Sequence, residues 1–235
     1  MEKHLRKITK TRKFYLSSLI ILFVSFTLTS QTPSLIHNIR FNMWANVDAY
    51  PGLEDAADYE GFEYPIKQIK EIAPFLVNGM VCGWEFSYTP YDKKRGVDEY
   101  LEINEIVPEV YVKQGIKYSS PWIEDNKFNC WIDYKRSDYD VQTYNQWSTI
   151  KNPVISGRGY GKVDIGFNGI KDAAEDALKE AIRNHYRPII KNKPKEIRGK
   201  VLIKEIPVIG VDEGRYAINL DFFLEWGKII EYTVF

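Results

Sequence analysis

The sequence predicts an α+β protein that is rich in strands. Several segments alternate apolar and polar residues, one long amphipathic helix stands near residues 168–187, and Gly- and Pro-rich turns separate these pieces. With 44% hydrophobic and 14% aromatic residues, the 235-residue chain has ample material for a buried core. We expect a signal peptide at 1–30, a β-rich domain with a long hairpin at 31–154, and a βαββ module at 155–235 with one Ala-rich helix on an antiparallel sheet.

The first thirty residues have the order of a secretory signal. Six Lys or Arg residues precede the uncharged apolar run 14–28, and small polar residues follow it. This run is shorter than the about 20 residues that a membrane-spanning helix needs. We therefore expect cleavage near Ser30 and a periplasmic or secreted protein, with a retained anchor, and membrane contact, as the alternative. No cysteine lies near the end of the run, so a lipoprotein is not expected.

Removal of this segment changes the charge balance. The mature chain keeps 32 − 6 = 26 bases and 32 − 1 = 31 acids, a formal charge of −5. General nucleic-acid binding depends on clustered Lys and Arg that neutralise phosphates. We therefore expect no nucleic-acid partner.

Residues 31–107 begin without a regular pattern and continue with a helix and a hairpin. Residues 31–64 are rich in turn formers, and their acidic part, 48–64, lacks the spacing of a calcium loop, so we expect a solvated loop. The segment 65–73 predicts a short helix with Pro65 in its first turn. Residues 80–88 and 97–107 alternate and predict a hairpin across the turn 89–96.

Further strands are predicted at 109–118 and 128–134. The stretch 122–147 is rich in aromatic residues, which in a β-rich domain usually fill the core. Flat aromatic faces also suit sugars. The alternative is a ligand-binding cluster made of Trp122, Trp131, Tyr134 and Trp147.

Cys82 and Cys130 are the cysteines of the chain, and both lie in strand-like segments. In an oxidising compartment an even count permits a disulfide between them. The alternative is two small buried hydrophobic side chains that never meet.

The segment 152–161 has four Gly or Pro residues and predicts a junction between two halves. Its GRGYG piece is not a nucleotide loop, because a strand predicted at 162–167 separates it from the next helix. That helix starts at Asn168, carries an apolar, Ala-rich stripe and ends before Pro188. Two strands then follow from Gly199 and Gly214, joined by a turn at 212–214.

A resemblance follows from these motifs. The strand with GYGK, the helix DAAEDALKEAI and the strands starting GKV and GRYAINL resemble the βαββ module of FlgT-like and related surface-lipoprotein envelope families, over residues 155–228. The resemblance implies a non-enzymatic role in an envelope assembly, near a flagellar motor. It assigns no functional residue, because the shared positions are structural.

The connection 187–200 is strongly basic. It holds six bases and one acid, so it is either a solvated linker or a docking patch for an acidic partner or an anionic glycan. The partner-binding residues of such a patch are Arg187, Lys191, Lys193, Lys195, Arg198 and Lys200. The partner is another envelope protein or a second copy of this chain.

No catalytic constellation is apparent. Of the three histidines, only His185 lies outside the signal and the irregular start, and it has no local metal-ligand partner. Glu85 and Asp98, on the two hairpin strands, are the carboxylate pair to inspect for glycan cleavage. We expect a non-enzymatic envelope component with no metal and no cofactor; the alternative is a carbohydrate-binding or glycan-cleaving envelope protein.

Overall fold

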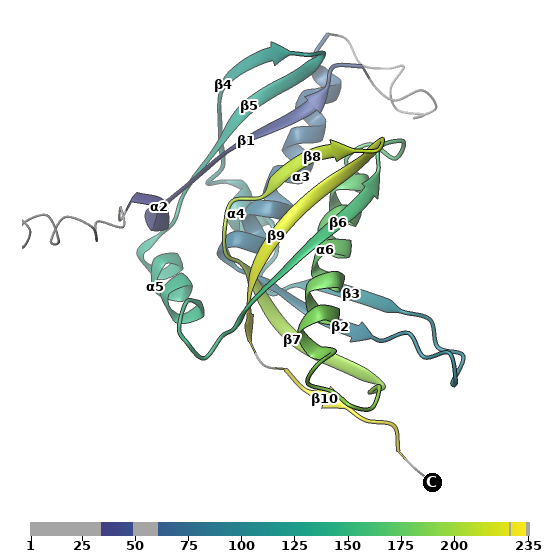
Figure 1. Ribbon diagram of the computed structural model, residues 1–235. Coiled ribbons are helices and arrows are strands. Elements are labelled where there is room, and N and C mark those ends of the chain that lie inside the picture. Colours follow the sequence, from purple (N-terminus) through teal and green to yellow (C-terminus); the bar gives the residue numbers. More distant parts are fainter. Residues whose placement is uncertain (1–33, 49–60, 226, 234–235) are drawn as a thin grey trace, which may run out of the picture. The chain divides into compact units, whose positions relative to one another are not determined.

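A computed structural model describes residues 34–48, 61–225 and 227–233. The expected signal peptide and most of the acidic segment 48–64 lie outside the described residues. The chain divides into two compact units, 1–35 and 36–235, and the second contains β1 and every described element after it. Its elements, drawn in Figure 1, confirm the predicted α+β class. None of the described helices combines the length and the apolar composition that crossing a bilayer requires.

The first layer is a three-stranded antiparallel sheet. Its strands are β1 (Asn38–Asn46), β5 (Lys127–Lys135) and β4 (Lys117–Glu124), in the order β1-β5-β4. The expectation that 31–64 is irregular is wrong for β1. Ile39, Phe41 and Met43 alternate there with exposed residues and are buried, which is the signature of a half-buried strand.

Helix α3 (Glu63–Val81) packs on the inner face of this sheet. The predicted helix 65–73 is confirmed, but the helix is longer than predicted and extends to Val81. The strand predicted at 80–88 begins only at Trp84, the first residue of β2 (Trp84–Thr89). Ile69, Ile72 and Leu76 continue one buried stripe past Pro74, so burial of that stripe outweighs the proline. The expected strand 109–118 is also wrong: α4 (Val110–Lys113) precedes β4.

The larger sheet has the order β3-β2-β7-β9-β6. Its remaining members are β8, which pairs with β9, and β10, which pairs with β7. The predicted hairpin is formed by β2 and β3 (Tyr100–Glu105). The other bounds are β6 (Val154–Lys162), β7 (Glu196–Ile203), β8 (Val208–Asp212), β9 (Arg215–Glu225) and β10 (Ile229–Ile230). Because β2 pairs with β7, this sheet takes strands from both sides of the boundary expected at 154/155.

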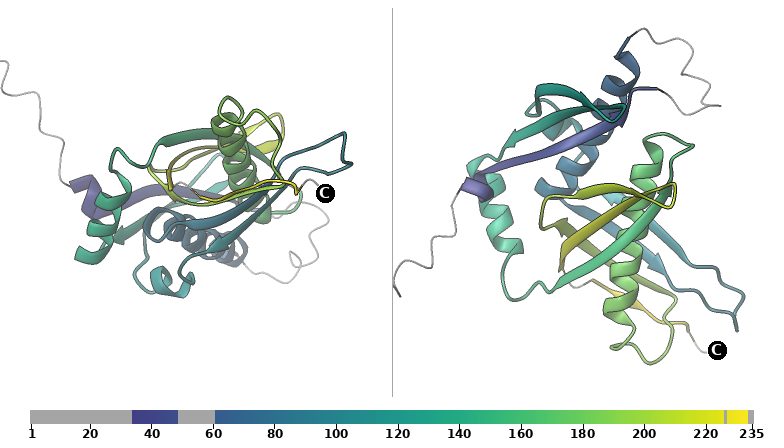
Figure 2. Two further views of the ribbon diagram at one scale, coloured as in Figure 1. Left: turned by 90° about the horizontal axis from the view of Figure 1, so that it is seen from below. Right: turned by 45° about the horizontal axis from the view of Figure 1, so that its top comes forward.

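Helix α6 (Asn168–Tyr186) lies across β6 and β9, as Figures 1 and 2 show. The GRGYG segment is not a junction but part of β6, and the strand predicted at 162–167 is absent except for Lys162, the last residue of β6. Its glycines let the helix backbone touch the strand: a Cβ on Gly159 would lie 2.0 Å from the Ala173 carbonyl oxygen. The backbone amides of Arg158 and Tyr160 donate to carboxylates of α6, at 2.7 and 3.1 Å.

The C-terminal module differs from the expected two strands after the helix. The segment from Gly199 is split into β7 and β8 by residues 204–207, and β8 forms a hairpin with β9 through Glu213 and Gly214. Both turn residues have positive φ, at 50° and 73°. On the opposite face of the sheet from α6, helix α5 (Asp138–Trp147) contributes Trp147 to a small cluster with Leu202 and Phe223.

Candidate functional site

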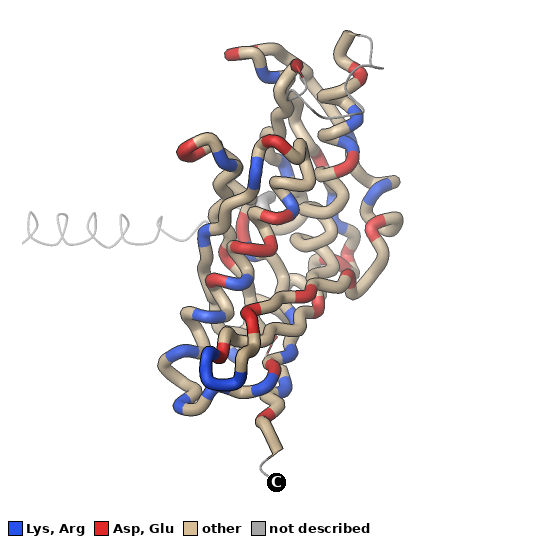
Figure 3. The backbone as a smooth tube through the Cα atoms, turned by 90° about the vertical axis from the view of Figure 1, so that its right-hand side faces the viewer, with Lys and Arg blue, Asp and Glu red and all other residues tan. Residues whose placement is uncertain are grey.

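A hollow of about 620 Å³ lies between the β2–β3 hairpin, the end of α6 and the connection to β7. We call it the basic hollow. Among its described lining residues, four are cations and one, Glu99, is a carboxylate. Its lining residues are Tyr88, Pro90, Tyr91, Glu99, Arg183, Tyr186, Arg187, Ile190, Lys191, Lys193, Pro194 and Ile197. Figure 3 shows Lys and Arg gathered toward the lower end of the view.

The single carboxylate of the hollow is already bound on several sides. The Tyr88 hydroxyl donates to Glu99 Oε1 at 2.6 Å, and Arg183 donates from Nε at 2.9 Å and from Nη2 at 2.6 Å. Burial acts to raise the pKa of Glu99, but these hydrogen bonds and the Arg183 charge lower it overall. Burial, and then the bond to Glu99, raises the pKa of Tyr88. Glu99 therefore holds Arg183 in place. Arg187, Lys191 and Lys193 have no carboxylate partner among the described residues that line the hollow.

The local fold brings these cations to one place. Helix α6 ends at Tyr186, and the backbone amides of Ile189 and Ile190 both donate to the Tyr186 carbonyl, so a turn follows the helix directly. Cations are favoured at this end by the negative pole of the helix. Lys193 then ties the connection to the hairpin: its ammonium donates to the Tyr91 carbonyl at 2.6 Å and lies 5.6 Å from the Tyr91 ring centroid.

The six predicted partner-binding residues do not form one patch. Arg187, Lys191 and Lys193 line the basic hollow. Lys195 directly precedes β7, and its backbone amide donates to the Ile230 carbonyl of β10. Arg198 and Lys200 lie in β7 and line a different depression.

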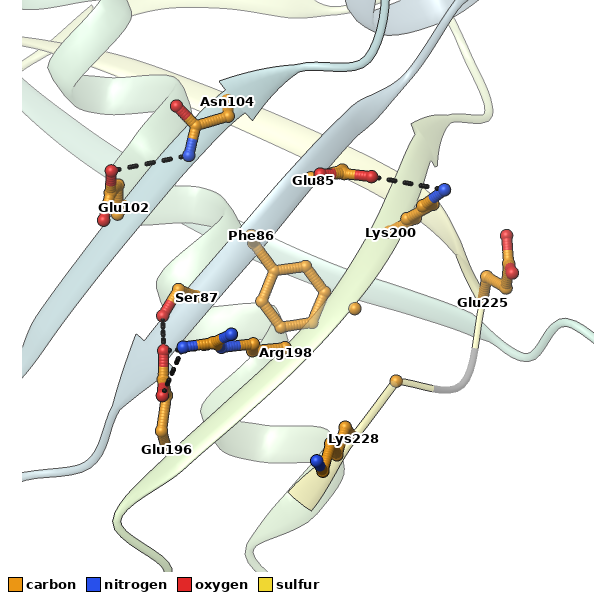
Figure 4. A pocket seen from close by; sticks show the side chains of 12 residues that line it. Glu85, Phe86, Ser87, Glu102, Asn104, Glu196, Arg198, Lys200, Glu225 and Lys228 are labelled. Atoms are coloured by element: carbon orange, nitrogen blue, oxygen red, sulfur yellow. Dashed lines mark hydrogen bonds and ion pairs between the residues drawn. The ribbon is translucent and has the colours of Figure 1, made fainter. Parts of the chain in front are cut away.

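This second depression, of about 430 Å³, is an open polar face of β3, β2 and β7 (Figure 4). Several of its charged groups bind one another. Lys200 pairs with Glu85 at 3.2 Å, and Glu196 accepts from Arg198, at 2.9 and 3.0 Å, and from the Ser87 hydroxyl. The Arg198 and Ser87 bonds hold the pKa of Glu196 below its usual value. A carboxylate kept ionised in this way is a poor general acid.

A protein-family model matches residues 27–232. The chain belongs to the family that this model describes. An uncharacterized protein of Treponema pallidum (strain Nichols) is 28% identical over 203 residues, which cover 84% of this chain and 83% of that protein. No solved structure matches the chain.

The structure does not bring together Glu85 and Asp98, the carboxylates considered for glycan cleavage. Glu85 pairs with Asn104 in the hairpin, whereas Asp98 lies six residues before Asn104 and precedes the first residue of β3, Tyr100. That offset corresponds to roughly 15–20 Å, since a strand rises about 3.3 Å per residue. Glycosidase carboxylates lie no more than about 9.5 Å apart, so this pair does not fit such a reaction.

The predicted aromatic cluster is divided between surfaces. Tyr134 and Trp147 are buried in separate hydrophobic clusters, so they present no face to a ligand. Trp122 and Trp131 are only partly buried and lie side by side, with ring centroids 6.0 Å apart. Only this pair remains of the predicted cluster as a surface feature.

Cys82 and Cys130 are free thiols, so the disulfide considered from the sequence is not formed. Cys82 follows the end of α3, while Cys130 lies in β5, where Met43 of β1 is its partner in the sheet. Burial raises the pKa of each thiol to about 11, for Cys82 with help from Asp140 and Glu105. Neither thiol has the lowered pKa of a nucleophile.

His185 lies in the last turn of α6, with its ring edge-on to Tyr186 and its pKa lowered by burial. Within the described ranges, no group of three or more His, Cys, Asp or Glu residues is arranged to hold a metal ion.

Sequence reasoning missed Tyr88, Tyr91 and Glu99 as parts of a site. They are about a hundred positions from the basic connection, and no local signal links the two segments.

Proposed function

We propose that this protein is an exported, non-enzymatic accessory component of a bacterial envelope assembly, and that its basic hollow docks an acidic polypeptide segment of a partner. The observation that carries the proposal is the composition of the hollow. Arg187, Lys191 and Lys193 surround aromatic and aliphatic walls, and the only carboxylate among the described lining residues is bound to Arg183.

Such a site suits an acidic segment that also carries apolar side chains. The cations attract the acids over a distance of about 8–10 Å in physiological salt and thereby speed up encounter. The walls formed by Tyr91, Tyr186 and Ile190 supply apolar area, which contributes most of the affinity. The signal-like first thirty residues support export, and the resemblance to FlgT-like and surface-lipoprotein modules supports an envelope role, including one at the flagellar motor.

The test is photo-crosslinking in intact cells. A photoreactive phenylalanine derivative replaces Tyr91 in the wall of the hollow or, as the control, Tyr139, which is exposed on α5. We expect one reproducible envelope protein at position 91 and not at position 139. Capture should be lost in the Arg187→Glu, Lys191→Glu double variant and kept in a Lys113→Glu, Lys151→Glu control.

The purified partner gives a second readout. Its affinity should fall as salt rises, and a peptide from its acidic segment should compete for binding. The hollow is not the docking site if capture is equal at both positions, or if capture persists in the Arg187→Glu, Lys191→Glu variant.

A further inference from the structure

The outer face of the three-stranded sheet carries a pair of tryptophans. Trp122 of β4 and Trp131 of β5 lie on the face opposite to the one that buries Ile132 and Tyr134 against α3. Their ring centroids are 6.0 Å apart and their planes meet at 37°. Both side chains are partly exposed.

A backbone irregularity puts Trp122 there. Ser119 pairs with Trp131 and Trp122 pairs with Asn129, so three steps along β4 match two steps along β5. This is a bulge of one residue. With unbroken alternation from Ser119, Trp122 would point inward, because side chains change face at each residue. The bulge includes Ser120 at φ 48°, a conformation that costs free energy for a residue other than glycine.

The bulge costs free energy and places the Trp122 ring on the outer face, so it does not increase the apolar area that the core buries. Bulges that re-aim a side chain are common beside functional sites, and strain of this kind persists where surrounding structure enforces it. The position of Trp122 next to Trp131 is therefore evidence for a ligand surface and not for core packing.

A row of polar side chains adjoins the rings. Arg40 and Lys117 lie on either side of Asp133 in register across the three strands. The Arg40 guanidinium lies 5.0 Å from the Trp131 ring centroid and 3.5 Å from Asp133, and the Ser119 hydroxyl donates to Asp133 at 2.8 Å.

Lys135 stands one pair further along the same face of β5. This row and its neighbour thus offer three cations, Arg40, Lys117 and Lys135, to one carboxylate that is already hydrogen-bonded. The same face also carries Glu124, which accepts a hydrogen bond from the Trp122 indole N–H at 3.3 Å, and Lys127, its partner in register. Among the described residues on this face of the three strands, the cations still outnumber the carboxylates.

We propose that this face binds an acidic saccharide, a chain of hexopyranose units that carry carboxylates. The apolar face of a pyranose ring stacks on an indole, and the positive row provides charge complementarity for the sugar carboxylates. Arg40, Ser119 and Asp133 supply donors and acceptors for hydroxyl groups. This site lies on a different sheet from the basic hollow and goes beyond the proposed docking of an acidic polypeptide.

The experiment is a titration of the purified, isotope-labelled protein with tetragalacturonate, followed through the tryptophan indole N–H signals in NMR spectra. We expect the Trp122 and Trp131 signals to shift and those of the buried Trp84 and Trp147 to stay in place. Trp122→Ala should weaken binding roughly tenfold, since it removes one aromatic contact. Tyr139→Ala, which removes an exposed ring from α5, should change nothing.

Further arms separate the alternatives. Lys117→Glu, an exposed change that spares the rings, should also weaken tetragalacturonate binding several-fold, and it keeps the test decisive if Trp122→Ala unfolds the sheet. The carboxyl-reduced, neutral tetrasaccharide should bind more weakly than the acidic one. Tetraglutamate should leave both indole signals in place, and Trp122→Ala should not affect photo-crosslinking at the basic hollow.

The proposal is overturned if the two indole signals do not move with tetragalacturonate, or if binding survives both Trp122→Ala and Lys117→Glu. Equal binding of the neutral tetrasaccharide would overturn the assignment to acidic sugars. A shift of the same signals by tetraglutamate would assign the face to polyanions in general and overturn the saccharide.

Discussion

Gly159 should be among the positions of this protein least tolerant of a methyl group. In a Gly159→Ala variant, the new Cβ would meet the Ala173 carbonyl oxygen at 2.0 Å and the Ala177 backbone nitrogen at 2.1 Å. Real Cβ contacts are essentially never shorter than 3.0 Å, so β6 and α6 must separate by about 1 Å. Backbone atoms of a helix cannot rotate aside as a side chain can.

The cost follows from what the separation disturbs. Helix α6 buries a continuous stripe against the sheet, including Ile170, Leu178 and Ile182. Overpacking of a well-packed core typically costs about 1–3 kcal/mol and occasionally more. Because the clash is between two backbones, we expect about 3 kcal/mol or more, a large part of the roughly 5–15 kcal/mol that stabilises a typical domain.

The assay is equilibrium unfolding by urea and by heat. A loss of 3 kcal/mol should lower the melting temperature by about 6–12 °C in a unit of about 200 residues. The matched control is Gly210→Ala in β8, where the added Cβ meets nothing within 4 Å and φ is not positive. That control should be neutral or slightly stabilising, since alanine costs less conformational entropy than glycine.

The reasoning would be refuted if Gly159→Ala unfolded within about 0.5 kcal/mol of the parent protein. Such a result would mean that α6 lies further from β6 than the structure has it. A loss of equal size in Gly210→Ala would instead point to a general intolerance of strand glycines.

Three further predictions concern buried or paired groups. Arg136 is 6% exposed and donates to the Ile36 and Met80 carbonyls at 2.8 and 2.9 Å, so Arg136→Met should cost about 2–4 kcal/mol in urea unfolding by leaving two carbonyls unpaired. The lowered pKa of Glu99 adds stability above its unfolded pKa of about 4.3, and this is lost as pH falls through the folded pKa. The difference in melting temperature between the parent protein and Glu99→Gln should therefore shrink below pH 4.5; a constant difference down to pH 3 would contradict it. Without reductant, a thiol reagent at pH 8 should react slowly with the native protein and label two thiols after denaturation, because burial raises both cysteine pKa values to about 11; an absence of thiols would indicate a disulfide.

Some elements could be read from local patterns. Alternating residues give β2 and β5, and the spacing of alanines gives α6 almost to its ends, because these patterns depend only on which face of an element is buried. The same rule would have found β1, where apolar residues alternate over 38–46. The predicted helix 65–73 is shorter than α3, because the alternating residues 80–88 predict a strand although the buried stripe of the helix continues to Val81.

The surface sites depend on which strands and helices lie next to one another in the fold. The pairing of β2 with β7 joins residues about a hundred positions apart, and it creates both the polar face and the wall of the basic hollow. The bulge in β4 reverses the face of Trp122, although the residues 119–122 carry no local signal that fixes the register.

The sequence by itself determined the α+β class, the helix on an antiparallel sheet and the hairpin, since a local period of apolar residues is enough to specify an element and its buried face. Tertiary structure alone decided which strands pair, which cations share a hollow and which tryptophans reach solvent. Those outcomes are set by the packing of surfaces from distant segments, as when the glycines of β6 admit the alanines of α6, and no short stretch of sequence contains both partners.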